Sequence, residues 1–141
     1  MPIFNPAITL DTLTKISENT MVSHLGIEVI KIGEDFIEAK MPVDKRTHQP
    51  QGLLHGGASV ALAETLGSLG AACCIDLNKQ YCVGLEINAN HIKSVRDGFV
   101  YGITRPIHLG KKTQVWEIKI TNESQELVCI SRITMAVIDK K

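Results

Sequence analysis

A long apolar segment that carries a single charge limits the folds open to this chain. Between Gln49 and Ile75 the only formally charged residue is Glu64. Residues 56–75 predict one helix of about 19 residues, roughly 28 Å long at 1.5 Å per residue. Because this helix is apolar on nearly every face, we expect it to be buried inside the fold. A buried carboxylate without a partner costs several kcal/mol, so Glu64 needs a structural or a functional reason.

The rest of the chain predicts a short N-terminal helix and a set of strands. Residues 8–18 place apolar side chains at helical spacing, and Thr9 is a possible N-cap. Consecutive strands joined by short turns predict an antiparallel meander. We therefore predict an α+β fold in which an antiparallel sheet of about six strands wraps around one long helix, as a single domain over residues 1–141. The predicted strands are 27–32, 36–41, 81–95, 99–107, 113–120 and 126–138.

Composition excludes several classes of protein. Fifteen Lys and Arg residues balance fifteen Asp and Glu residues, which argues against a nucleic-acid partner and a polybasic membrane anchor. No apolar run reaches the ~20 residues that span a bilayer, and the first residues show no secretory signal, so we expect a cytoplasmic protein without a membrane partner. The four cysteines form no C-x-x-C pair and no Cys/His cluster with ligand spacing. We expect free thiols and no metal site.

Small residues surround Glu64 on its face of the predicted helix. Gly57, Ala61, Glu64 and Ser68 follow one another at spacings of three or four residues, so they share one face. They leave room for a ligand beside the carboxylate, and Ser68 can hydrogen-bond the carboxylate or a water. Two interpretations stay open: a structural carboxylate that pairs at a subunit interface, and a base or nucleophile in a partly dry pocket.

The start of the same helix predicts a site for a developing negative charge. The first N–H groups of a helix lack partners and carry the positive end of its dipole. Glycine lets a ligand approach closely, so the Gly56 and Gly57 amides predict an oxyanion site. Glu64 lies more than two turns further along the helix than His55. One helix cannot bring both groups to one small reacting group, so we expect a site shared across a dimer.

Two polar side chains precede the helix, and one serine follows. His55 is either a structural hydrogen-bonding group or a general base. Gln49, in the preceding loop, is placed to reach the substrate oxygen at the predicted oxyanion site or to hold His55. Ser59 stands in a near match to G-x-S-x-G, but a nucleophile elbow needs a preceding strand and a glycine where this chain has Ala61. We therefore do not expect Ser59 to be the nucleophile.

Three segments resemble the hotdog-fold acyl-CoA thioesterases. Residues 49–65 are QPQGLLHGGASVALAET, residues 83–91 are VGLEINANH, and residues 106–110 are PIHLG. The chain is similar to the 4-hydroxybenzoyl-CoA thioesterase group with a glutamate on the helix. It looks especially like the bacterial subgroup of 1,4-dihydroxy-2-naphthoyl-CoA thioesterase and the proofreading thioesterase of enterobactin synthesis. The resemblance implies the hotdog fold, a two-fold homodimer and commonly a dimer of dimers.

The resemblance also implies roles for individual residues. Glu64 is the nucleophile or the general base, and the Gly56 amide polarises the thioester carbonyl. His55 and Gln49 position that carbonyl or the leaving thiolate, and Ser68 holds the hydrolytic water. The implied substrate is an acyl-CoA with an aromatic acyl group, and no cofactor is expected because coenzyme A belongs to the substrate. Six basic residues are candidates for the phosphates of coenzyme A: His91, Lys93, Arg96, Arg105, Lys111 and Lys112.

Two other functions stay open from the residues. An enoyl-thioester hydratase on the same fold would need a polar Asp/His pair, and Glu64 with Ser68 fits hydrolysis better. A non-catalytic acyl-CoA-binding oligomer would keep Glu64 in a structural role. Release of free thiol from an aryl-CoA separates these interpretations.

Overall fold

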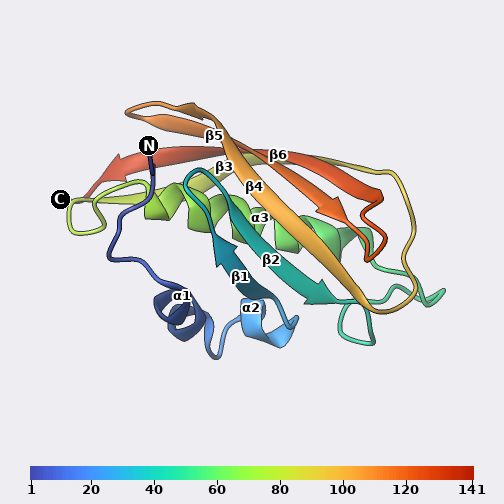
Figure 1. Ribbon diagram of the computed structural model, residues 1–141. Helices are drawn as coiled ribbons and strands as arrows, with labels where there is room; N and C mark the ends of the chain where they lie inside the picture. The colour runs from blue at the N-terminus through green and yellow to red at the C-terminus, as the bar shows by residue number, and fades with distance from the viewer.

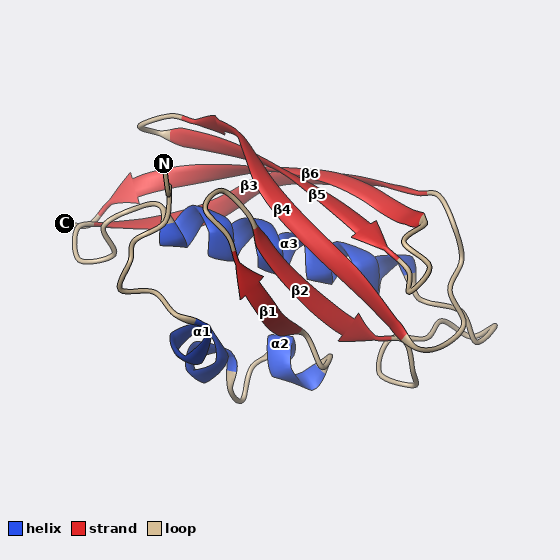
Figure 2. Cartoon of the chain, in the orientation of Figure 1, coloured by secondary structure: helices blue, strands red, loops and turns tan.

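The long helix α3 (Gly56–Cys73) lies at the centre of the fold. In the computed structural model, which describes residues 1–141, it runs along one side of a six-stranded sheet that curves around it (Figures 1 and 2). Leu66 on its sheet-facing side is fully buried. A Cβ added at Gly70 would lie 2.8 Å from the Trp116 ring, which explains why this helix position lacks a side chain. The predicted helix and the sheet wrapped around it are confirmed.

The sheet contains all six predicted strands. Hydrogen bonding orders them β1-β2-β4-β5-β6-β3, with every neighbouring pair antiparallel. The meander prediction is therefore wrong for β3, which pairs with β6 at the far edge rather than with the next strand in sequence, β4. The reason is α3, since the helix carries the chain across the sheet between β2 and β3 (Figure 1). The strands are β1 (Glu28–Ile32), β2 (Ile37–Pro42), β3 (Gln80–His91), β4 (Phe99–Leu109), β5 (Thr113–Thr121) and β6 (Leu127–Asp139).

Two short helices precede the sheet and lie below β1 in the view of Figure 1. The helix α1 (Leu10–Ser17) is confirmed, with Thr9 as its N-cap accepting the Thr12 N–H at 3.2 Å. The helix α2 (Met21–His24) is not predicted from the sequence, because a single turn shows no helical periodicity. No helix of the structure has both the length and the apolarity needed to cross a membrane.

One face of α3 is left uncovered by the chain. Glu64 on this face is exposed, and Thr65, Ser68 and Ala72 beside it are half-buried. The expectation that Glu64 lies in a buried interior is therefore wrong for the single chain. The apolar pattern surrounds α3, but the sheet of this chain covers only part of the helix.

Strand β3 forms a free edge of the sheet. It is 12 residues long, with β6 on one side and no strand on the other. Its side chains Tyr81, Val83 and Leu85 are 43%, 39% and 61% exposed. The opposite edge is β1, which has 5 residues and exposes the charged side chains Glu28 and Lys31. Long apolar edges invite pairing with another chain, whereas short charged edges discourage it.

Candidate active site

The first turn of α3 presents one free backbone amide. His55 is the N-cap residue, and its Nδ1 accepts the Gly57 N–H at 2.7 Å. Because Nδ1 accepts, the proton of the neutral ring lies on Nε2, which leaves that nitrogen as a donor. The Gly56 N–H donates to no acceptor within the chain. The two amides considered for an oxyanion site are thus reduced to one, since the Gly57 amide is already bonded.

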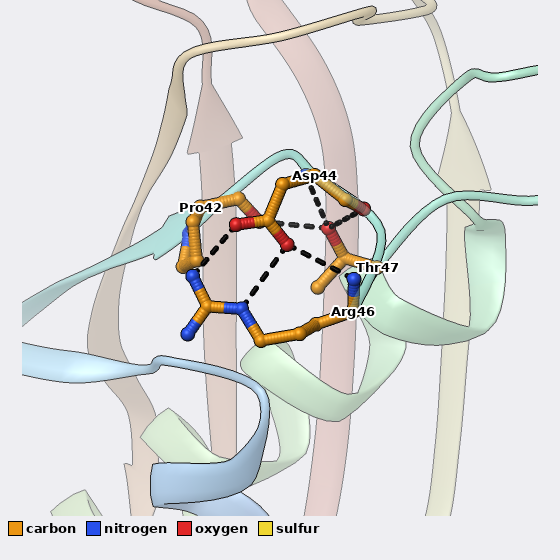
Figure 3. Close-up of polar contacts among 4 residues, drawn as sticks. All are labelled: Pro42, Asp44, Arg46 and Thr47. Carbon is orange, nitrogen blue, oxygen red and sulfur yellow. Dashed lines mark hydrogen bonds and ion pairs between the residues drawn. The ribbon is translucent and has the colours of Figure 1, made fainter.

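A hydrogen-bond network fixes the loop that leads into α3 (Figure 3). The Thr47 hydroxyl donates to the Pro42 carbonyl at 2.7 Å, at the end of β2. Arg46 donates to the two carboxylate oxygens of Asp44 at 3.1 and 2.6 Å, and this side-chain hydrogen bonding is the main reason that the pKa of Asp44 is lowered to about 2. The Thr47 carbonyl accepts the His55 N–H at 2.8 Å. The start of α3 is therefore anchored to the end of β2.

Gln49 lies in the same loop with half of its side-chain amide engaged. Its Oε1 accepts the backbone N–H groups of Gln51 and Leu53, which leaves the Nε2 hydrogens as free donors. Gln49 lines a cavity of about 320 Å³ together with Gly56 and His91. The His91 ring lies against Gly56, where an added Cβ would be 3.0 Å from Nε2. This cavity therefore gathers several hydrogen-bond donors at the start of α3.

Glu64 lines a different and larger cavity. This cavity has a volume of about 540 Å³, and its walls include Ser68 on α3, the residues around α2, and Cys82 on β3. The Glu64 carboxylate lies against β3 at Gly84, where an added Cβ would be 2.9 Å from Oε2. Burial raises the pKa of the Cys82 thiol, so this thiol is neutral. The carboxylate is thus the one charged group on a mainly apolar wall.

The two halves of the predicted site lie apart in one chain. The Gly56 amide and the Glu64 carboxylate belong to different cavities. Helical geometry separates them by about 12 Å of rise. Strand β3 runs past them in the opposite direction, with His91 against Gly56 and Gly84 against Glu64. Within one chain, the carboxylate and the amide cannot meet at one thioester.

The basic residues considered for coenzyme A do not form one cluster. His91 and Lys93 line the cavity at the start of α3. Lys111 and Lys112 line a third cavity, of about 530 Å³, beside the C-cap residue Cys74 at the other end of α3. The structure therefore brings the two pairs to opposite ends of the helix.

The two arginines of that set lie outside these cavities. The Arg105 guanidinium stacks over the Phe36 ring at 4.9 Å from its centre, on the side of β4 that faces away from α3. Arg96 follows β3, and its carbonyl accepts His48 Nε2–H at 2.8 Å. Arg105 is thus engaged elsewhere, whereas Arg96 helps to hold the loop before α3 in place.

Sequence reasoning missed the N-terminal wall of the Glu64 cavity. Met21, Val22 and Leu25 line it from α2 and its C-cap. The local markers of this turn are the Thr20 hydroxyl, which accepts the Val22 N–H at 3.2 Å, and the Ser23 hydroxyl, which accepts the Thr20 N–H at 3.3 Å. A threonine N-cap before one turn is too weak a pattern to show that the turn covers a cavity formed by α3.

The fold and the site together define a class of enzyme. Residues 51–129 match the family model described as the thioesterase superfamily, and a long helix against a six-stranded antiparallel sheet is the architecture of solved thioesterases. The chain belongs to the thioesterase superfamily. The predicted hotdog fold and thioester hydrolase activity are thereby confirmed.

Individual relatives match nearly the whole chain. The 1,4-dihydroxy-2-naphthoyl-CoA hydrolase of Escherichia coli is 51% identical over 96% of this chain and 99% of its own length. The proofreading thioesterase EntH of Cronobacter turicensis is 50% identical over 96% of this chain and 98% of its own length. A crystal structure of a mutant thioesterase from Pseudomonas aeruginosa is 44% identical, with a TM-score of 0.96 over 98% of this chain and 99% of that one.

Proposed function

We propose that this thioesterase hydrolyses acyl-CoA, with aromatic acyl groups among its substrates. The observation that carries the proposal is the Glu64 carboxylate on the wall of an apolar cavity, on the same helix that begins with an unbonded amide. A relative that is 51% identical is named for 1,4-dihydroxy-2-naphthoyl-CoA, an aromatic acyl-CoA. That name supports the same substrate class for this chain.

In the proposed reaction, the thioester carbonyl oxygen binds at the Gly56 N–H. This amide and the positive end of α3 stabilise the negative charge that develops on the oxygen. As a general base, Glu64 removes a proton from a water held by Ser68, and the hydroxide attacks the carbonyl carbon. The C–S bond then breaks, and Glu64 returns the proton to the thiolate. As a nucleophile, Glu64 would instead form an anhydride that water hydrolyses. Either route consumes one water and releases one acid and one thiol.

His55 and Gln49 are proposed to position the carbonyl or the leaving thiolate. The N-cap bond leaves His55 Nε2–H free, and the loop amides leave the Gln49 Nε2 hydrogens free. Neither group has to change its charge during the reaction. We therefore expect smaller losses of kcat from His55→Ala and Gln49→Ala than from loss of Glu64, and likewise from Ser68→Ala.

We propose that two chains pair through β3 and complete each other's active site. The free edge of β3 is long, and its first half exposes the apolar side chains of Tyr81, Val83 and Leu85. Because His91 lies beside Gly56 and Gly84 lies beside Glu64, antiparallel pairing of two β3 strands brings the Gly56 turn of one chain toward the Glu64 carboxylate of the other. The register that sets His91 opposite the partner's Gly84 achieves this. A dimer of such dimers is the proposed larger assembly.

The same pairing would regroup the basic residues. It brings the C-terminal end of one α3 toward the N-terminal end of the other, and Arg96 lies in the adjoining loop. Arg105 is engaged with Phe36, and we propose that it does not contact coenzyme A. The proposed phosphate ligands are His91 and Lys93 of one chain with Lys111 and Lys112 of the other.

No metal or prosthetic group takes part in the proposed reaction, and the free cysteines suit a cytoplasmic location.

Substitution of Glu64 tests the chemical proposal. Glu64→Gln keeps the shape of the side chain and removes the base and nucleophile, so kcat for benzoyl-CoA is expected to fall by roughly 10²–10⁴. Glu34→Gln, in the exposed turn between β1 and β2, is the matched control and should keep wild-type activity. The assay is release of free thiol, with oligomeric state measured in parallel. Near-wild-type turnover by Glu64→Gln would contradict the assigned role.

The same assay separates the alternative functions. Wild-type protein that binds acyl-CoA without releasing thiol would be a binding oligomer, and water addition to an enoyl-CoA without thiol release would mark a hydratase. Ser59 is not supported as a nucleophile. It is 1% exposed and lies within α3, which follows a loop rather than the strand that a nucleophile elbow needs.

Mixing two inactive variants tests whether the site is shared. Glu64→Gln removes one half of the site, and Gly56→Pro removes the other. A mixed dimer then has one site with both substitutions and one site with neither. Random exchange of equal amounts makes half of the dimers mixed, so activity should recover to about one quarter of the wild-type level. No recovery, with chain exchange shown by mass spectrometry, would place each site within one chain.

A further inference from the structure

The cavity that contains Glu64 continues along α3 well beyond the carboxylate. Its wall on α3 runs from Ala61 through Glu64 and Ser68 to Ala72. From Glu64 to Ala72 the helix rises about 12 Å at 1.5 Å per residue. The cavity volume of about 540 Å³ is large for a single aromatic ring, so the space beyond Glu64 needs an explanation.

Cys82 lies at the same remote end, on the opposite wall. Strand β3 runs back along α3, and its residue Gly84 lies against Glu64. Cys82 precedes Gly84 by two residues, so it faces the same side and lies about 7 Å closer to the C-terminal end of α3. Ala72 and Cys82 both line the cavity. They therefore bound it at the end remote from Glu64.

Polar groups are confined to the part of the cavity near Glu64. The Thr65 hydroxyl donates to the Ala61 carbonyl at 2.7 Å, so its hydrogen is used within the helix. The Ser68 hydroxyl lies one turn from the carboxylate. Beyond it the wall consists of apolar side chains and the Cys82 thiol, which is neutral because burial raises its pKa. The remote end therefore offers a substrate no charge and no strong hydrogen-bond partner.

We propose that Ala72 and Cys82 set the maximum length of the acyl group, and that the preferred substrates are extended apolar acyl groups that reach them. This inference rests on the proposed acyl-CoA hydrolase function. At about 1.5 Å per carbon–carbon bond, a straight chain of roughly eight to ten carbons spans the distance. A bicyclic aromatic group extends further toward this end than a single ring. A polar group at the far end of the acyl chain would lose its hydration without gaining a partner.

A chain-length series tests the assignment. The ratio of kcat/KM for octanoyl-CoA to that for butanoyl-CoA is measured for wild type, Ala72→Leu, Cys82→Leu and the size-conserving control Ala72→Ser. Each buried methylene raises kcat/KM by about fourfold, so the wild-type ratio is expected to be well above one. Leucine at either position fills the remote end and is expected to lower this ratio by at least about tenfold. Ala72→Ser is expected to keep the wild-type ratio.

An unchanged ratio in both leucine variants, with folded protein shown by its Tm, would overturn the assignment. Wild-type protein that hydrolyses no acyl-CoA would overturn the proposed function instead, so the two failures are distinguishable. A second measurement needs no variant: octanoyl-CoA is compared with the analogue that carries a carboxylate at its far end. The charged analogue is expected to lose at least about tenfold in kcat/KM. Equal turnover of the two would overturn the assignment of an apolar remote end.

Discussion

Replacing Gly56 by proline removes the amide hydrogen on which the proposed oxyanion site depends. Gly56 is the first residue of α3, and its N–H has no partner within the chain. Proline is well tolerated at the first position of a helix, because the N–H that it lacks is not used there. The preceding residue, His55, has φ −69° and ψ 131°, which is the extended conformation that a residue before proline prefers. We therefore expect α3 to form normally in this variant.

The expected effect on catalysis is large. Loss of one oxyanion donor typically lowers kcat by roughly 10²–10³, equivalent to about 2.7–4 kcal/mol. Proline also adds side-chain atoms, and a Cβ at this position lies 3.0 Å from Nε2 of His91, so the His91 ring has to move slightly. Gly56→Ala adds the same Cβ but keeps the N–H, which makes it the matched control. The ratio of kcat between the alanine and proline variants isolates the amide and is expected to be roughly 10² or more.

Initial rates of thiol release over a range of benzoyl-CoA concentrations provide the assay. We expect the loss to fall on kcat more than on KM, because the amide bonds most strongly to the charge that develops in the transition state. Tm and oligomeric state, measured for both variants, show whether the fold and the assembly survive. If the proline variant is folded and its kcat stays within about threefold of the alanine variant, the Gly56 amide does not stabilise an oxyanion.

Three further predictions concern the Glu64 contact, the loop before α3 and the thiols. Gly84→Ala places a Cβ 2.9 Å from Glu64 Oε2, so the displaced carboxylate is expected to lower kcat by about tenfold while Tm is retained, and an unchanged kcat would contradict this. The pKa of Asp44 is lowered from 3.8 to about 2, so its ionised form stabilises the fold. This stabilisation is fully present at pH values above 3.8 and is lost as the pH falls toward 2. Asp44→Asn is therefore expected to lower Tm slightly at neutral pH, by an amount that shrinks in acid; a constant difference would refute the assignment. Burial raises the pKa of Cys73 to about 11 and that of Cys74 to about 12, so peptide mapping should show that iodoacetamide labels both far more slowly in native than in unfolded protein.

Local sequence patterns predict a helix or strand of this fold well where the interactions that form it lie within one segment of the chain. Thr9, followed by apolar residues at helical spacing, predicts the helix observed at Leu10–Ser17. The strand predicted to reach position 95 instead ends at His91. The reason is a distant partner, since the Val95 carbonyl accepts the Leu54 N–H at 2.8 Å and holds this segment against the loop before α3. Such a contact leaves no mark in the alternation of the strand itself.

The order of the strands lies beyond local patterns. Alternation of apolar and polar residues shows that a strand has a buried face, but it does not name the neighbouring strand. The 18-residue helix α3 separates β2 from β3, and it is long enough to carry the chain across the whole sheet. The position of β3 beside β6 therefore depends on how α3 crosses the sheet, which is a property of the packed molecule.

The candidate site also has one feature that the sequence predicts and another that only the packed structure shows. The separation of Gly56 from Glu64 follows from helical rise alone, so the sequence is sufficient to predict that one chain cannot join them. The walls of the Glu64 cavity are different, because Met21 and Cys82 come from segments that precede and follow α3. Which side chains lie beyond Glu64, and hence how long an acyl group fits, depends on tertiary packing.

The exposure of Glu64 shows what apolar patterning measures. A run of apolar residues indicates that a surface is removed from water, but not which chain removes it. In this chain, α3 has a face that the sheet does not cover, and β3 exposes apolar side chains along part of an edge that no strand pairs. These two uncovered surfaces meet where Glu64 lies against Gly84. In the proposed dimer, the contacts that remove these surfaces from water are therefore the same contacts that bring a partner's Gly56 amide to the carboxylate, so stability of the assembly and completion of the active site depend on one interface.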